Sequence, residues 1–213
     1  MNIAVYSGSF NPLHIGHLAI MKYLTGEGGF DCVYLVVSPK NPLKEGISSD
    51  SGMDRYNAAV KAVNRHFGCG YDISDGCHEQ EELLQSDPQQ SSDVAEAKVK
   101  VDDIELTMPE PHYTIRTLDA LKEREPENSF TLIMGADNLA DIRRWREYSR
   151  ILKEYGVAVY PRKGFDLNQI KEDLLTEDSG YRITLLNAEM VDISSTIIRN
   201  AIASGQDVSG WLM

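Results

Sequence analysis

The chain has 213 residues, of which 42% are hydrophobic, and a formal net charge of −12 at pH 7. The length suits one α/β domain over residues 1–213 with a core of its own. The negative charge argues against general nucleic-acid binding, which needs a broad basic surface, and no apolar run approaches the ~20 residues that cross a bilayer. We therefore expect neither nucleic acid nor a membrane as a partner.

Apolar strand patterns and amphipathic helix patterns alternate along the chain. They predict strands at 2–7, 32–38, 100–106, 129–134, 155–160 and 182–187, and helices at 15–25, 53–66, 114–124, 141–153, 167–176 and 195–204. This alternation is typical of a Rossmann-like, doubly wound parallel sheet with helices on both faces. Ligands of such sheets bind at the carboxyl ends of the strands, so one rim is expected to hold Gly8, Ser38, Gly135 and Arg162.

The first strand leads into a turn of small residues, Ser7–Pro12, and then into His14-Ile15-Gly16-His17. Gly8 lets the backbone approach a ligand closely, and histidines three positions apart share one face of a helix. Free N–H groups and two imidazoles at a helix start suit the phosphates of a nucleotide. An isolated histidine pair more often lies on a solvated face, but the preceding glycine turn favours a phosphate site.

A second candidate site lies near the C-terminus, in the segment from Ile193 to Arg199. Ser194, Ser195 and Thr196 predict the N-cap and first turn of the last helix. Their hydroxyls, the free N–H groups and Arg199 one turn later would form a second cradle for phosphates. Ser-Ser-Thr alone is merely a good helix cap. The two segments together favour nucleotide binding.

Residues 74–98 are acidic and rich in glutamine and serine, which predicts a solvated insertion rather than a lid or a partner-binding segment. The three cysteines are an odd number without framework spacing, which suits a reducing cytoplasm. We expect no protein-bound metal centre. The alternative, a zinc site without a strong ligand spacing, would use His66, Cys69, Cys77 and His78.

The two motifs resemble the two signatures of the nucleotidyltransferase superfamily. They read Gly8-Ser9-Phe10-Asn11-Pro12-x-His14-x-Gly16-His17 and Ile193-Ser194-Ser195-Thr196-x-Ile198-Arg199. Within the superfamily, the chain most resembles the bacterial nicotinate-nucleotide adenylyltransferases. Further matching segments follow in the family's order, at Ser38–Lys44, Tyr113–Leu118, Gly135–Leu139, Trp145–Tyr148 and Tyr160–Gly164. The chain departs from the family at residues 74–98 and at Pro109–His112, where the family tends to carry an arginine and a glycine.

The resemblance implies adenylyl transfer from ATP, with Mg²⁺, to nicotinate mononucleotide, which gives nicotinate adenine dinucleotide and pyrophosphate in NAD biosynthesis. It implies catalytic roles for His14, His17 and Arg199. It implies ATP binding by Gly8, Ser9, Phe10, Gly135, Asp137, Arg162, Ser194, Ser195 and Thr196. It implies mononucleotide binding by Lys44, Tyr113, Thr114 and Trp145. The Mg²⁺ ion would bridge phosphate oxygens and need few protein ligands.

Several alternatives stay open at this point. The acceptor could be nicotinamide mononucleotide or phosphopantetheine. The reaction could instead be that of a glycerol phosphate cytidylyltransferase or another cytidylyltransferase, or the chain could be a non-catalytic nucleotide sensor. Class I aminoacyl-tRNA synthetases also carry a His-x-Gly-His motif. They need a Lys-Met-Ser-Lys-Ser-like loop and a tRNA-binding region, and this short acidic chain instead has the Ile-Ser-Ser-Thr segment. Formation of a homo-oligomer is left open.

Overall fold

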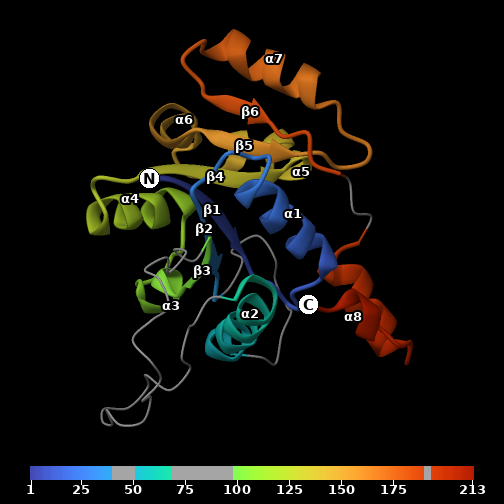
Figure 1. Ribbon diagram of the computed structural model, residues 1–213. Helices are drawn as coiled ribbons and strands as arrows, with labels where there is room; N and C mark the ends of the chain where they lie inside the picture. The colour runs from blue at the N-terminus through green and yellow to red at the C-terminus, as the bar shows by residue number, and fades with distance from the viewer. Residues whose placement is uncertain (40–50, 69–97, 190–192) are drawn as a thin grey trace, which may run out of the picture.

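The computed structural model describes residues 1–39, 51–68, 98–189 and 193–213. Six parallel strands form one sheet in the order β3-β2-β1-β4-β5-β6 (Figure 1). The strands are β1 Asn2–Gly8, β2 Cys32–Val37, β3 Val99–Asp102, β4 Ser129–Gly135, β5 Val157–Tyr160 and β6 Ile183–Leu185. The strand order reverses between β1 and β4, which confirms the predicted doubly wound sheet and marks where such sheets bind ligands.

The main helices follow the strands in sequence. They are α1 Ile15–Thr25, α2 Gly52–Phe67, α3 Ile104–Thr107, α4 Thr114–Arg124, α5 Ala136–Ala140, α6 Tyr148–Arg150, α7 Leu167–Glu177 and α8 Ser195–Ala203. Shorter 3₁₀ and π turns occupy η1 Ile142–Arg144, η2 Ile151–Tyr155 and η3 Ser209–Trp211. No helix in these described ranges is long and apolar enough to span a bilayer.

Two apolar layers hold the helices on the two faces of the sheet. All six residues of β2 are buried, as expected for an inner strand covered on both sides. Side chains of α1 and α2, such as Met21 and Val63, pack on one face. Side chains of α4 and α7, such as Leu118 and Leu174, pack on the other. Figure 1 shows α1 and α2 on the opposite side of the sheet from α4.

Two predicted elements are wrong in part. The helix predicted at 141–153 is broken, because Trp145 is extended and Glu147 has a left-handed φ of 52°. The strand predicted at 100–106 ends at Asp102, whose carboxylate accepts a hydrogen bond of 3.0 Å from the N–H of Ile104 and so begins α3. The predicted insertion 74–98 lies, except for Lys98, outside the described residues.

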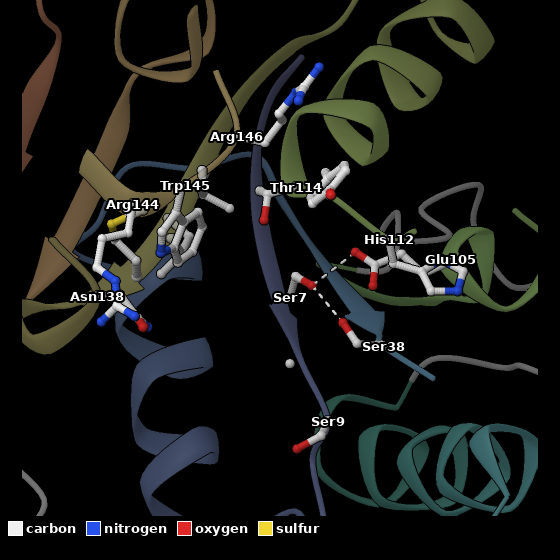
Figure 2. A pocket seen from close by; sticks show the side chains of 15 residues that line it. Ser7, Ser9, Ser38, Glu105, His112, Thr114, Asn138, Arg144, Trp145 and Arg146 are labelled. Atoms are coloured by element: carbon white, nitrogen blue, oxygen red, sulfur yellow. Dashed lines mark hydrogen bonds between the residues drawn. The ribbon is translucent and has the colours of Figure 1, made fainter. Parts of the chain in front are cut away.

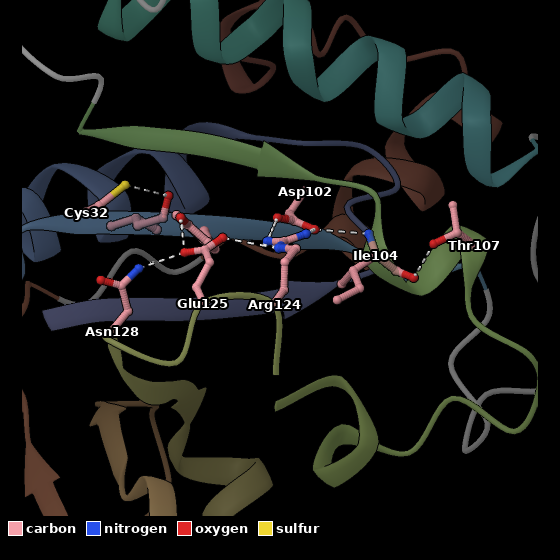
Figure 3. Close-up of polar contacts among 9 residues, drawn as sticks. Cys32, Asp102, Ile104, Thr107, Arg124, Glu125 and Asn128 are labelled. Atoms are coloured by element: carbon pink, nitrogen blue, oxygen red, sulfur yellow. Dashed lines mark hydrogen bonds and ion pairs between the residues drawn. The ribbon is translucent and has the colours of Figure 1, made fainter. Parts of the chain in front are cut away.

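An ion pair between the half-exposed Arg124 and the buried Asp102 lies at the start of α3. Asp102 accepts hydrogen bonds from the guanidinium of Arg124, with Nη2 2.5 Å from Oδ2, while its side chain is only 2% exposed (Figure 3). Arg124 also donates to Glu125, which in turn accepts from Asn128. The Asp102–Arg124 pair therefore links the end of β3 to the end of α4, and α3 lies in the chain between these two elements.

Candidate active site

The two motif histidines lie side by side at the start of α1. His14 is the N-cap, and its Nδ1 accepts from the N–H of Gly16 at 3.2 Å. His17 Nδ1 accepts from the N–H of His14, also at 3.2 Å, and the two ring centroids are 3.7 Å apart. Because both Nδ1 atoms accept, each neutral ring carries its proton on Nε2. This reciprocal capping confirms that the two imidazoles share one face of the helix.

Gly16 is required by this close stacking. A Cβ atom there would lie 3.0 Å from the ring of His14 and 3.0 Å from Cγ2 of Ile193. A side chain at this position would therefore push His14 away from the helix start.

The environment lowers the pKa of both imidazoles. Burial, and then the charge of Arg162, lowers the pKa of His14 to about 4. Burial, the neighbouring His14 and Arg162 together hold the pKa of His17 well below its usual value. Both rings are therefore neutral at pH 7 and can donate a hydrogen bond through Nε2.

These lowered pKa values predict that acid weakens the fold. The unfolded chain binds protons at its histidines near pH 6.5, whereas the folded chain resists them down to about pH 4 for His14. The free energy of unfolding should therefore fall by roughly 1 kcal/mol between pH 6.5 and pH 5. Urea unfolding of the wild type and of His14→Asn checks this, because the variant should lose part of the slope. Identical pH dependence in the two proteins would contradict it.

The second motif contacts the first across the whole length of the chain. Ser194 is the N-cap of α8, and its hydroxyl accepts from the N–H of Ile197 at 3.3 Å. Ser195 Oγ donates to the carbonyl oxygen of Pro12 at 3.1 Å. Arg199 donates from Nη1 to the carbonyl of Asn11 at 2.6 Å and from Nη2 to Oγ1 of Thr196 at 3.0 Å. The structure thus brings together the two segments that the sequence paired only by resemblance.

A third group joins them from the ends of β4 and β5. Arg162 has its guanidinium carbon 5.1 Å from the centre of the Tyr160 ring and its Nε 3.9 Å from Asp137 Oδ1. Arg162 also lines a small cavity with both histidines. Gly135 lies beneath this group, because a Cβ there would meet the Tyr160 ring at 3.1 Å. Arg162 therefore places a positive charge beside the imidazoles, in a cavity that Glu189 also lines.

Phe10 is the one predicted ATP-binding residue whose side chain is buried. Its ring packs edge-on against His17 at 5.2 Å between centroids and against Tyr6 at 5.5 Å. Its φ of 44° turns the chain sharply after β1. Gly8 accommodates this turn, since a Cβ there would lie 3.1 Å from the Phe10 ring. The Phe10 ring therefore packs against His17, and at Phe10 only the backbone is left to meet a ligand.

A larger cavity of about 210 Å³ opens on the opposite side of β1 (Figure 2). Tyr113, Thr114 and Trp145, the described residues predicted for the mononucleotide, all line it, and so do Gly8 and Ser9. Lys44, the fourth predicted residue, lies outside the described residues. Ser38, expected on the ligand-binding rim, also lines the cavity. So do residues with no ligand role predicted from the sequence, among them Ser7, Glu105, His112, Asn138, Arg144 and Arg146. The two arginines flank Trp145 in sequence, a signal that could have found them.

Comparison with known proteins supports one family. The cytidylyltransferase-like family matches residues 5–201. Two bacterial proteins that carry the name "Probable nicotinate-nucleotide adenylyltransferase" align with nearly the full chain. That of Flavobacterium johnsoniae is 32% identical over 100% of this chain and 92% of its own length, and that of Bacteroides fragilis is 35% identical over 98% and 85%.

A solved structure supports the same fold. The Plasmodium falciparum nicotinic acid mononucleotide adenylyltransferase complexed with NaAD superposes with a TM-score of 0.69 at 20% identity, over 97% of this chain and 86% of that one. The order of strands, the paired motifs and these matches agree. The chain therefore belongs to the cytidylyltransferase-like family and, within it, to the nicotinate-nucleotide adenylyltransferases.

Proposed function

We propose that the chain transfers an adenylyl group from ATP to nicotinate mononucleotide, giving nicotinate adenine dinucleotide and pyrophosphate for NAD biosynthesis. The names of the bacterial relatives support this substrate pair. The observation that carries the proposal is the presence of two cavities at the carboxyl end of β1. One is lined by His14, His17 and Arg162, and the other by Trp145 and the start of α4. A reaction that joins two nucleotides needs two adjoining sites of this kind.

The reaction needs positioning more than proton transfer. A phosphate oxygen of the mononucleotide attacks the α-phosphorus of ATP, a new P–O bond forms, and the bond to the β-phosphate breaks to release pyrophosphate. The attacking phosphate is already an anion, so no general base is required. Holding the two substrates in line and neutralising charge on the phosphates then supply the catalysis.

The histidine side of β1 is assigned to ATP. The Nε2–H groups of His14 and His17 would donate to phosphate oxygens, with His17 supporting the charge that develops at the α-phosphate. Arg162 and Arg199 would supply positive charge. The start of α8 at Ser194, Ser195 and Thr196 would hold the β- and γ-phosphates. The turn formed by Gly8, Ser9 and Phe10 would approach the phosphates with its backbone, and the adenosine is assigned to Gly135 and Asp137.

Mg²⁺ is proposed to enter with ATP as part of the substrate. Across residues 1–39, 51–68, 98–189 and 193–213, no cluster of three His, Cys, Asp or Glu side chains could hold a metal ion. In phosphoryl transfer, substrate phosphates and water provide most of the Mg²⁺ ligands.

The other cavity is assigned to nicotinate mononucleotide. Trp145 offers an aromatic face for the pyridine ring, and Arg144 and Arg146 beside it offer charge for the phosphate. Tyr113 is the N-cap of α4 and makes no side-chain capping bond, so the N–H groups of Thr114 and its successor are free for an anion. Lys44 is assigned to the mononucleotide phosphate.

Pyrophosphate release tests the proposed function directly. The purified chain is supplied with Mg²⁺ and ATP and with one of three acceptors: nicotinate mononucleotide, nicotinamide mononucleotide or phosphopantetheine. We expect release with nicotinate mononucleotide well above the other two. A preference for another acceptor would keep adenylyl transfer but overturn the substrate. ATP binding without release for any acceptor would favour the nucleotide sensor.

Replacement of Trp145 by alanine should weaken binding of the mononucleotide but not binding of ATP. Stacking of a base on an aromatic ring is worth about 1–3 kcal/mol, so we expect KM for the mononucleotide to rise by about tenfold or more while KM for ATP stays within about twofold. Steady-state kinetics measure both values. Phe165→Ala, at an exposed aromatic residue that lines neither cavity, is the control and should change neither. An equal rise in both KM values would indicate that Trp145 supports the fold rather than the ring.

A further inference from the structure

Glu105 is a buried acidic side chain in the wall of the mononucleotide cavity. It is 3% exposed and lies on α3, the short helix between β3 and α4. Figure 2 shows its carboxylate directed toward Ser7 at the centre of the cavity wall. A carboxylate is unexpected in a pocket for a phosphorylated ligand, because it repels the phosphate.

Two hydroxyl groups hold the carboxylate in place. Glu105 Oε1 accepts from Thr117 Oγ1 at 2.9 Å and from Ser7 Oγ at 3.2 Å, and Ser7 Oγ is 3.1 Å from Ser38 Oγ. Both bonds use Oε1, and Oε2 has no hydrogen bond to the described residues. Packing therefore requires only an acceptor at Oε1, which a glutamine amide would also provide. The negative charge is not used by these contacts.

The backbone around Glu105 is fixed before any ligand binds. The neighbouring N–H of Ile104 donates to Asp102, and Asp102 is paired with Arg124 (Figure 3). The carboxylate is thus held at one place by the sheet on one side and by α4 on the other. A charge fixed in this way loses little conformational freedom when a ligand binds, so its interaction with the ligand is not offset by that cost.

The two arginines of the cavity lining lie away from Glu105. Arg144 and Arg146 flank Trp145 in sequence, whereas Figure 2 shows His112 beside Glu105. A phosphate or carboxylate would turn toward the arginines. The Glu105 side suits a cationic group instead. That group has to be flat and apolar enough to fit beside Trp145.

We propose that Glu105 is a specificity-determining residue that supplies the counter-charge for a pyridinium ring; this inference rests on the proposed function. In nicotinate mononucleotide the ring nitrogen is bonded to the ribose, so the ring carries a permanent positive charge. The reduced 1,4-dihydropyridine form has nearly the same shape, the same carboxylate and phosphate, and an uncharged ring. Glu105 therefore discriminates between the oxidised and reduced forms of the same mononucleotide.

Binding of the two ring forms tests this inference. Isothermal titration of the wild type with nicotinate mononucleotide and with its 1,4-dihydro form should show the oxidised form binding about tenfold more tightly, as expected for an opposite charge a few ångströms away. Glu105→Gln keeps the acceptor at Oε1 and removes the charge. We expect this variant to lose most of the preference while its affinity for ATP is unchanged.

Glu125→Gln is the matched control. Glu125 is also a partly buried glutamate that accepts side-chain hydrogen bonds, from Tyr34 and Asn128, and it does not line the cavity. Its substitution changes the net charge equally and should leave the preference intact. Glu105→Asp, which keeps the charge, should retain part of the preference.

The outcomes separate this inference from the proposed function. Equal affinity of the wild type for the two ring forms would overturn the role of Glu105 even if Glu105→Gln failed to fold. An equal loss of affinity for both forms in Glu105→Gln would show a structural role and likewise overturn it. Failure of the wild type to bind either form would overturn the proposed substrate and the inference together.

Discussion

Replacement of His17 by alanine is expected to lower kcat for pyrophosphate release by about 100-fold or more, the usual effect of removing one preorganised donor at a developing charge. His17 is the residue best fixed for this task. Its Nδ1 is occupied by the N–H of His14, its ring packs on Phe10, and its lowered pKa keeps the ring a neutral donor at pH 7. Single-turnover assays at saturating ATP and mononucleotide would measure the chemical step.

Two further variants make the result specific. His17→Gln carries an amide that can still donate, so it should recover part of the rate lost in the alanine variant. His66→Ala removes an exposed histidine of α2 and should leave kcat unchanged. Circular dichroism and an ATP affinity within a few-fold of the wild type would show that the fold is intact. An unchanged kcat in His17→Ala would remove His17 from the mechanism.

Replacement of Arg55 by methionine is expected to reduce the free energy of unfolding by about 3 kcal/mol, because hydrogen bonds to charged groups contribute more than neutral ones. Arg55 lies on α2 and is 5% exposed. Its Nη1 donates to the carbonyls of Ser9 at 2.6 Å and Ser38 at 2.7 Å, and its Nη2 donates to the carbonyl of Pro39 at 2.6 Å. Methionine fills a similar volume but leaves three carbonyl oxygens without these donors.

The same substitution should also affect the site. Ser9 and Ser38 line the mononucleotide cavity, so loosening the segments after β1 and β2 should raise KM for the mononucleotide as well. Urea denaturation measures the stability. Arg65→Met, at an exposed position of the same helix, is the control and should cost less than about 0.5 kcal/mol. A loss equally small in Arg55→Met would show that water replaces the guanidinium without cost.

The sequence indicated the sheet, most helices and the histidine pair because each carries a local signal. The inner strands are short apolar runs, and Ser194 is a good helix cap whose bond the structure confirms. The segment 141–153 carries no such signal for its break. It contains neither Gly nor Pro, and its apolar positions fit a helical period, so tertiary packing overrides local preference at Glu147.

The burial of charged side chains was not predicted, for a different reason. Hydrophobic periodicity assigns charged residues to the surface, whereas Arg55 and Glu105 are buried. Their partners are distant in sequence: Glu105 meets Ser7 across 98 positions, and Arg55 meets Ser9 across 46. Only the folded arrangement brings these charged groups and their partners together. The proposed ligand roles of the motif residues remain predictions for the experiments above.

The alternation of side chains along β1 separates the two cavities by the thickness of one strand. Tyr6 lines the cavity of the histidines, while its neighbour Ser7 lines the cavity of Trp145. A single molecule that filled both would lose its rigid-body freedom only once, so its affinity would exceed that of either half by the effective concentration of a short tether. The dinucleotide product is such a molecule. A non-hydrolysable mimic of it is therefore the natural starting point for an inhibitor.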